Sequence, residues 1–237
     1  MHKKFLVLLG VPLATGPLFL QGCSPTVSQS ASLDSSSESE TSTSSKATSP
    51  ETPKPNVGAK VSSNGQFKNL PIYTDANSPD NHYIPSGWTG DFSDLKFNDK
   101  HMVNPHSGST SVQVIYSNKA TQGARWSGIY WQNPPNNWGT RPGGYDLTGA
   151  KKLTFWARGE KGGERIEEFK IGGITGEYAD SDVAGIGPVV LTTDWQQFTI
   201  DLEGKDLSSI SGGFCWATNL DVNPDGATFY LDDIRYE

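Results

Sequence analysis

The residues best suited to chemistry stand together between positions 125 and 145, in a stretch that mixes indole rings, amides and turn formers. Its aromatic side chains include Trp131 and Trp138, and its polar ones include Gln132, Asn137 and Arg141. Flat rings can stack on the apolar C–H face of a sugar, while amides and a guanidinium can hydrogen-bond its hydroxyls. A loop this polar cannot bury every ring, so these five residues are candidate ligand contacts. The alternative is that the loop covers an open sheet edge and Trp138 fills the core.

A second polar segment, residues 177–182, precedes an apolar run that begins at Pro188. Together with Trp216 and Asn219 it could line the same face, which makes Trp216 a further candidate for ligand contact. An acidic loop that faces solvent explains these residues equally well.

Common motifs of hydrolytic or metal-dependent catalysis are missing from the sequence. It contains no Gly-x-Ser-x-Gly, no His-Glu-x-x-His and no phosphate-cradling glycine loop. The four histidines show no spacing typical of zinc ligands. Glu164 and Glu168 offer carboxylates of the kind that glycosidases pair across a cleft, but they stand in what reads as a glycine-flanked turn. These observations favour binding over catalysis.

Short strands must position these residues. Runs rich in β-branched and aromatic residues alternate with Gly-Gly, Asn-Pro, Asp-Gly and charged turns, at 111–116, 128–131, 153–157, 168–171, 188–191, 197–202, 213–217 and 228–232. Long helical periodicity is missing. About eight to ten strands of this kind predict an all-β domain, a two-sheet β-sandwich, over residues 67–237.

The N-terminus reads as an export signal over residues 1–22, with a short basic start followed by an apolar run. Its end, Leu20-Gln21-Gly22-Cys23, resembles the lipobox of bacterial lipoproteins. The resemblance implies that Cys23 is lipidated and anchors the protein to a membrane outside the cytoplasm, at the outer membrane or cell surface. An ordinary secretory signal with a chance cysteine is the alternative. Residues 23–66 are rich in Ser, Thr and Pro and predict a disordered tether.

Charge and cysteine content narrow the partners. The chain has a formal net charge of -7, and loss of residues 1–22 would leave 26 acidic residues against 17 basic ones. Such a protein is not expected to bind nucleic acid. With Cys23 assigned to lipid, Cys215 has no disulfide partner and is expected to be a small buried side chain.

Four segments, at 108–114, 153–159, 192–202 and 229–234, resemble the jelly-roll carbohydrate-binding modules grouped as galactose-binding-like sandwiches. The resemblance implies a two-sheet jelly-roll β-sandwich and an oligo- or polysaccharide partner. It also implies that Asp232 ligates a structural Ca²⁺, with Asp91 and Asp94 available as further oxygen ligands. Alternatively, Asp232 or Asp233 hydrogen-bonds a neighbouring loop. Trp156 and Trp195 lie in these segments and are expected in the core or at its rim, with ligand contact as the alternative.

The sequence therefore predicts a membrane-anchored lipoprotein whose β-sandwich binds carbohydrate without catalysis. Two alternatives remain: a polysaccharide-acting hydrolase or lyase, and an envelope assembly or structural protein that binds another protein.

Overall fold

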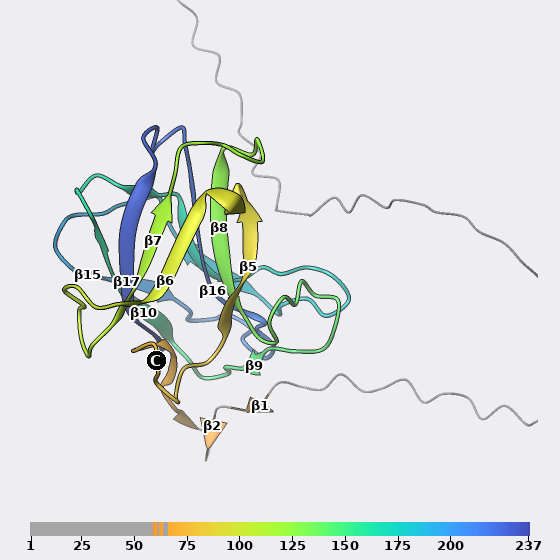
Figure 1. The fold of residues 1–237 in the computed structure, drawn as a ribbon. Coiled ribbons are helices and arrows are strands. Elements are labelled where there is room, and N and C mark those ends of the chain that lie inside the picture. Colours follow the sequence, from red (N-terminus) through yellow and green to blue (C-terminus); the bar gives the residue numbers. More distant parts are fainter. Residues whose placement is uncertain (1–58, 61, 64–65) are drawn as a thin grey trace, which may run out of the picture. The chain divides into compact units, whose positions relative to one another are not determined.

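Two antiparallel sheets dominate the computed structural model, which describes residues 59–60, 62–63 and 66–237 (Figure 1). The predicted signal peptide, Cys23 and most of the predicted tether lie outside the described residues. The last part of the range assigned to the tether contains three two-residue strands, β1 (Ala59–Lys60), β2 (Ser62–Ser63) and β3 (Gln66–Phe67).

The first main sheet has six strands, and its central strand is the last in the chain. Its order is β15 (Gln196–Asp201), β10 (Lys152–Gly159), β17 (Ala227–Tyr236), β7 (Ser111–Tyr116) and β6 (Leu95–His101), with β4 (Leu70–Tyr73) pairing the C-terminal half of β17. The second sheet has five strands in the order β13 (Val183–Ile186), β12 (Glu168–Gly172), β16 (Gly212–Asn219), β8 (Trp126–Gln132) and β5 (Ile84–Gly90).

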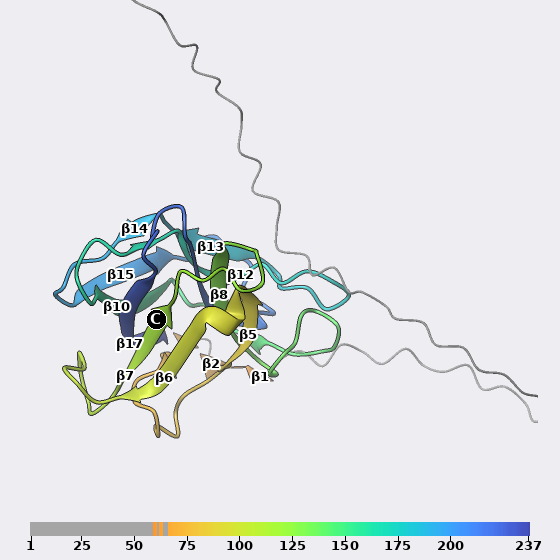
Figure 2. The same ribbon diagram turned by 45° about the horizontal axis from the view of Figure 1, so that its top comes forward.

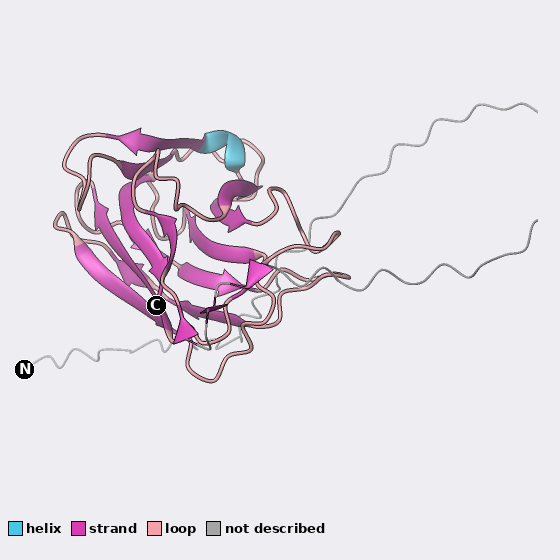
Figure 3. Ribbon diagram, turned by 90° about the horizontal axis from the view of Figure 1, so that it is seen from below, coloured by secondary structure: helices cyan, strands magenta, loops and turns pink. Residues whose placement is uncertain are grey.

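The remaining elements are small. β9 (Tyr145–Asp146) pairs in parallel with β1, and β11 (Arg165–Ile166) pairs with β14 (Val189–Val190). Among the described residues the helical content is one 3₁₀ turn, η1 (Phe92–Asp94), which stands out against the strands in Figure 3. In this part of the chain, no helix is long and apolar enough to cross a membrane.

The core lies between the two sheets, whose inward side chains meet ring against ring. Phe155 of β10 contacts Phe169 of β12 and Phe214 of β16 at centroid distances of 4.6 and 5.2 Å. Strand alternation places Leu153, Phe155 and Ala157 on the inner face, and all three are fully buried. The two layers and their shared interior confirm the predicted all-β sandwich (Figure 2).

Two long loops project side by side beyond β8 and β12 (Figure 1). One runs over residues 133–144, and the other over 173–182. The Tyr178 amide donates a hydrogen bond to the Gly139 carbonyl at 3.0 Å, which joins the two loops directly. Five of the candidate ligand contacts fall on β8 or on the first of these loops, whereas Trp216 lies on β16 and the predicted calcium ligand Asp232 lies on β17.

Candidate functional site

Trp131 and Trp216 belong to the core, so the expectation that they contact a ligand is wrong. Trp131 is 2% exposed, and its ring packs edge-on against Phe97 and Phe214 at 5.7 and 5.5 Å. Trp216 is fully buried and packs edge-on against Phe229 at 4.9 Å. Both rings come from adjacent strands of the five-stranded sheet and point toward the six-stranded one.

Gln132 and Asn137 are also fully buried, and their amides hold the 133–144 loop in place. Gln132 donates from Nε2 to the Asn137 carbonyl at 3.1 Å and accepts from Ser86 Oγ at 3.0 Å. Asn137 donates from Nδ2 to the Arg141 carbonyl at 2.9 Å, and its Oδ1 accepts from the Gly139 amide at 3.2 Å. These side chains satisfy backbone groups of the loop, so the expectation that they bind a ligand directly is corrected to a supporting role.

Trp138 and Arg141 remain at the surface. Arg141 is exposed, with Nη2 donating to the Pro135 carbonyl at 2.6 Å. Trp138 is partly exposed and meets Tyr130 edge-to-face at a centroid distance of 5.6 Å. It closes a small cluster with Ile174 and Cys215 that is separate from the main core. Cys215 is 3% exposed, as expected for a small buried side chain.

This cluster lies on the outer face of the five-stranded sheet. Because Ile129 and Trp131 of β8 point into the core, the alternating residues Trp126, Gly128 and Tyr130 point outward. Along the strand, Trp126 and Tyr130 are about 13 Å apart. Two aromatic residues on one rigid strand thus stand at either side of a glycine.

Small residues surround that glycine in the neighbouring strands. Gly128 pairs with Ala217 of β16 and with Thr89 of β5, and the next row places Gly87 opposite Tyr130. A Cβ added at Gly128 would come within 2.6 Å of the Trp216 carbonyl oxygen, so a side chain does not fit there. We call this outer surface the Trp138 face, defined by Trp126, Tyr130, Trp138, Glu168 and Lys170.

Charged side chains of β12 border the Trp138 face. Lys170 pairs in register with Cys215, and its Nζ lies 2.8 Å from Glu168 Oε2 and 5.6 Å from the Tyr130 ring centroid. The pair supplies an ammonium donor and a carboxylate acceptor beside the Tyr130 ring, which is 7% exposed and carries the partly exposed Trp138 ring against it. Such a combination suits a ligand with apolar C–H surfaces and many hydroxyl groups.

The acidic segment 177–182 serves mainly to join loops. Asp180 Oδ2 accepts from the Ile174 amide at 3.0 Å, and Oδ1 accepts from the Ser211 amide at 2.5 Å. Burial raises the pKa of Asp180 above its ordinary value, against the opposing effect of these hydrogen bonds. Asp182 forms an ion pair with Lys205 at 3.2 Å. These carboxylates therefore fasten the 173–182 loop to residues 205–212.

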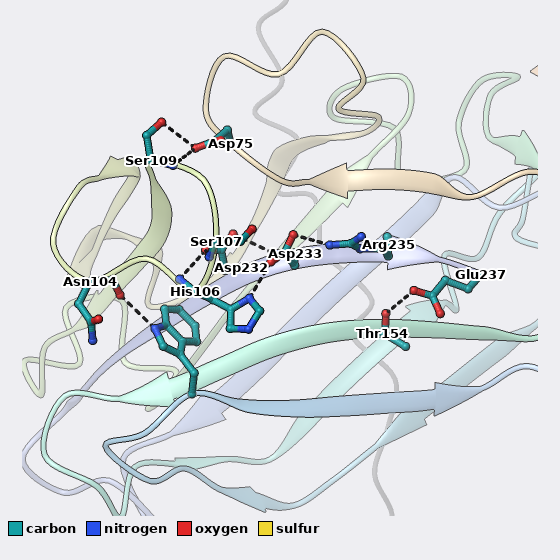
Figure 4. Close-up of polar contacts among 11 residues, drawn as sticks. Asp75, Asn104, His106, Ser107, Ser109, Thr154, Asp232, Asp233, Arg235 and Glu237 are labelled. Atoms are coloured by element: carbon teal, nitrogen blue, oxygen red, sulfur yellow. Dashed lines mark hydrogen bonds and ion pairs between the residues drawn. The ribbon is translucent and has the colours of Figure 1, made fainter.

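Asp232 holds a loop on the other sheet. Its Oδ2 accepts from the amides of His106 and Ser107 at 2.9 and 3.3 Å, and its Oδ1 accepts from the Asp233 amide at 2.8 Å (Figure 4). Burial raises the pKa of Asp232 to about 6. These contacts match the alternative in which Asp232 hydrogen-bonds a neighbouring loop.

The proposed calcium ligands are not gathered at Asp232. Asp91 accepts from the amides of Gln122, Ala124 and Arg125, whereas Asp94 binds Thr121. Within the described part of the chain, no three His, Cys, Asp or Glu side chains form a group that could hold a metal ion. The calcium site stays a prediction from the resemblance.

Trp156 lies on the outer face of β10, between β15 and β17, and Trp195 directly precedes the edge strand β15; each is partly exposed. The His106 imidazole stacks on Trp156 at 3.7 Å between centroids, and Trp195 Nε1 donates to the Asn104 carbonyl at 3.0 Å. The 102–110 loop therefore folds over the outer side of this sheet.

Sequence reasoning missed Tyr130 and Lys170 as members of the Trp138 face. Tyr130 stands in an unbroken apolar run, where alternation gives no sign of which neighbour points outward. Lys170 offered a weak signal, since it is a charged residue between the apolar Phe169 and Ile171.

No family model and no curated protein matches the chain. Among solved structures, it is similar to the family 30 carbohydrate-binding module of the cellulosomal cellulase Cel9D-Cel44B of Clostridium thermocellum, with 17% identity, a TM-score of 0.48, and coverage of 72% of this chain and 98% of that one. It is also similar to the family 11 module of Lic26A-Cel5E of the same organism, with 13% identity, a TM-score of 0.37, and coverage of 60% and 79%. A variant of a family 29 module shares 10% identity at a TM-score of 0.41, with coverage of 72% and 91%. Likeness at this level says nothing about the ligand of this chain.

Proposed function

We propose that this protein binds carbohydrate without catalysis, and that the ligand lies on the Trp138 face. The observation that carries the proposal is the partly exposed Trp138 ring, fixed against Tyr130 on the outside of a rigid sheet. A ring held in this way can stack on a sugar with little ordering cost.

The hydrogen-bonding groups beside the ring give such a ligand its orientation. Lys170 can donate to a hydroxyl and Glu168 can accept from one, while Arg141 offers donors from the adjoining loop. A shallow surface of this kind supports affinities of about 10⁻⁶ to 10⁻³ M, or about -8 to -4 kcal/mol.

A glycan array of neutral polysaccharides, probed with the full chain, tests this proposal. We expect Trp138→Ala to weaken binding about tenfold or more, the effect of losing a central aromatic contact. Trp138→Phe should keep part of the affinity because a smaller ring still stacks. The matched control is Trp195→Ala, which removes a partly exposed indole from the other sheet and should leave neutral-glycan binding unchanged.

Two results would reject the proposal. One is a wild-type chain that retains no neutral glycan. The other is a Trp138→Ala variant that binds as tightly as wild type. Release of reducing sugar by the purified protein would favour the hydrolase alternative, and retention of another envelope protein without sugar would favour the assembly role.

The same proposal includes a membrane anchor on Cys23. Its support is the lipobox-like Leu20-Gln21-Gly22-Cys23, followed by a long stretch poor in apolar residues. Many tethered copies would compensate for weak single-site affinity through avidity. Expression in a bacterial host should place wild type in the membrane fraction and label it with a fatty-acid analogue. Cys23→Ser should lose both properties, and an unlabelled wild type would refute the anchor.

A further inference from the structure

Arg158 is a nearly buried cation on the outer side of the six-stranded sheet. It follows the inward-facing Ala157 of β10 and is 8% exposed. No hydrogen bond or ion pair joins its guanidinium to a residue that the structure describes, and Nε is buried without a partner. Burying a guanidinium whose N–H groups have no partner costs folding free energy. Native proteins usually supply such a group with a hydrogen-bond partner.

Two aromatic rings hold the guanidinium in place. Its central carbon lies 3.8 Å from the Tyr230 ring centroid and 5.3 Å from that of Trp195. Such contacts stabilise the positive charge, but they leave the N–H donors in the guanidinium plane unused.

The rings are themselves fixed. The Tyr230 hydroxyl donates to Glu160 Oε2 at 2.6 Å and accepts from Gln113 Nε2 at 3.1 Å. The Trp195 indole donates to the Asn104 carbonyl at 3.0 Å. Arg158 is therefore presented by an ordered frame that reaches across β10, β17 and β7.

We propose that Arg158 marks a second ligand site, which binds a carboxylate group of an acidic polysaccharide. The planar guanidinium matches a carboxylate through two parallel N–H···O bonds, and the two terminal Nη groups, rather than the buried Nε, would donate them. The site lies on the opposite sheet from the Trp138 face and goes beyond the neutral-glycan binding proposed above.

Apolar surface beside Arg158 favours a sugar ring as the carrier of the carboxylate. Trp156 and Trp195 are partly exposed, and in the neighbouring loop Met102 and Val103 are 73% and 68% exposed. A sugar acid offers both an apolar ring face for such side chains and an anionic group for the guanidinium.

The net charge of the chain bears on how an acidic polymer could bind. With a formal net charge of -7, the chain does not attract polyanions through a general electrostatic field. Binding of an acidic polymer therefore has to come from a local contact. Removal of that one contact should abolish most of the affinity.

Titration calorimetry of the full chain with polygalacturonate tests the site, and fully methyl-esterified galacturonan serves as a neutral ligand with the same backbone. We expect wild type to bind the acid and not the ester, with affinity falling as salt increases. Arg158→Gln should weaken binding about tenfold or more. Lys96→Gln, which removes an exposed positive charge from β6 of the same sheet, should change binding less than about twofold.

Arg158→Lys keeps the proposal testable if Arg158→Gln destabilises the fold. Lysine retains the charge but not the planar pair of donors, so binding should weaken severalfold while thermal unfolding stays close to wild type. Trp138→Ala should leave polygalacturonate binding unchanged, which separates failure of this site from failure of the proposed function. The inference is overturned if wild type ignores polygalacturonate, if both Arg158 variants bind it like wild type, or if a sulfated polymer binds and polygalacturonate does not.

Discussion

Truncation of Trp131 and of Trp138 should have opposite consequences for stability and binding, although the two residues are only seven positions apart. Trp131 is 2% exposed and packs against rings from both sheets, at 5.7 Å from Phe97 and 5.5 Å from Phe214. Replacing such a tryptophan with alanine costs about 3–5 kcal/mol of unfolding free energy, because transfer and cavity terms add. In a domain of this size, that loss lowers the melting temperature by roughly 6–20 °C.

Replacing Trp138 with alanine should cost far less unfolding free energy. It is partly exposed, and the ring partner that the structure describes for it is Tyr130, at 5.6 Å. That pairing contributes about 0.5–1.5 kcal/mol beyond the area that the indole buries, which corresponds to roughly 1–6 °C in melting temperature. The total fall should stay below that of Trp131→Ala, while neutral-glycan retention falls sharply.

Differential scanning calorimetry of both variants beside the glycan array provides the measurement. Far-ultraviolet circular dichroism before heating checks that each variant is folded. A Trp131→Ala variant that unfolds within about 2 °C of wild type and loses glycan binding would contradict the burial of Trp131, because that result would place the ring at the surface.

Three further substitutions test residues that hold loops in place or border the Trp138 face. Asn137→Ala leaves the Arg141 carbonyl and the Gly139 amide without their partners, so unfolding free energy should fall by about 1–3 kcal/mol, and limited proteolysis should cut the 133–144 loop faster. Lys170→Met should weaken glycan binding with little change in stability, since the ion pair between Lys170 and Glu168 is partly solvated. Equal binding by wild type and variant would show that Lys170 is not part of the site. The pKa of Asp232 is raised to about 6, so the native state holds this proton more tightly than the unfolded chain. Relative to Asp232→Asn, wild type should gain stability in urea titrations as pH falls from about 6 to about 4, whereas a flat difference would contradict the burial argument. Calcium bound at Asp232 would instead keep the carboxylate ionised. Added Ca²⁺ would then remove this pH dependence and raise the melting temperature, and EDTA would reverse both effects.

The strands were predictable from the sequence because their local signals agree with the fold. Alternation in 153–157 puts Leu153, Phe155 and Ala157 on one side of the strand and Trp156 on the other, and the structure buries the first three in the core. The run 228–232 lies within β17, whose inward residues Phe229 and Leu231 are fully buried. The all-β sandwich follows from many such runs between turns.

The direction of each aromatic ring was less predictable. In 128–131 every residue is glycine or apolar, so the sequence alone does not distinguish an inward Trp131 from an inward Tyr130. The choice depends on pairing with other strands, including the register shift between Gly212 and Phe214 where β16 meets β8. Tertiary contacts of this kind leave no local pattern.

The supporting role of the loop amides was hard to predict from the sequence for a related reason. Gln132 and Asn137 look like ligand contacts because amides serve sugars well, but an irregular segment must also satisfy its own backbone. The 133–144 loop uses these two side chains for that purpose. Arg158 illustrates the opposite case, since a lone arginine in a strand gives no hint that its neighbours leave its donors unused.

The two proposed sites should act independently, and a double variant tests whether they do. Trp138 and Arg158 lie on the outer sides of sheets whose backbones pack about 10 Å apart, and their contacts share no residue. Effects on stability from Trp138→Ala and Arg158→Gln should therefore add within about 0.5 kcal/mol. Binding should separate too, with neutral glycan lost through the first change and polygalacturonate through the second. A non-additive stability, or loss of both ligands from either single change, would mean that one site depends on the other through the sandwich core.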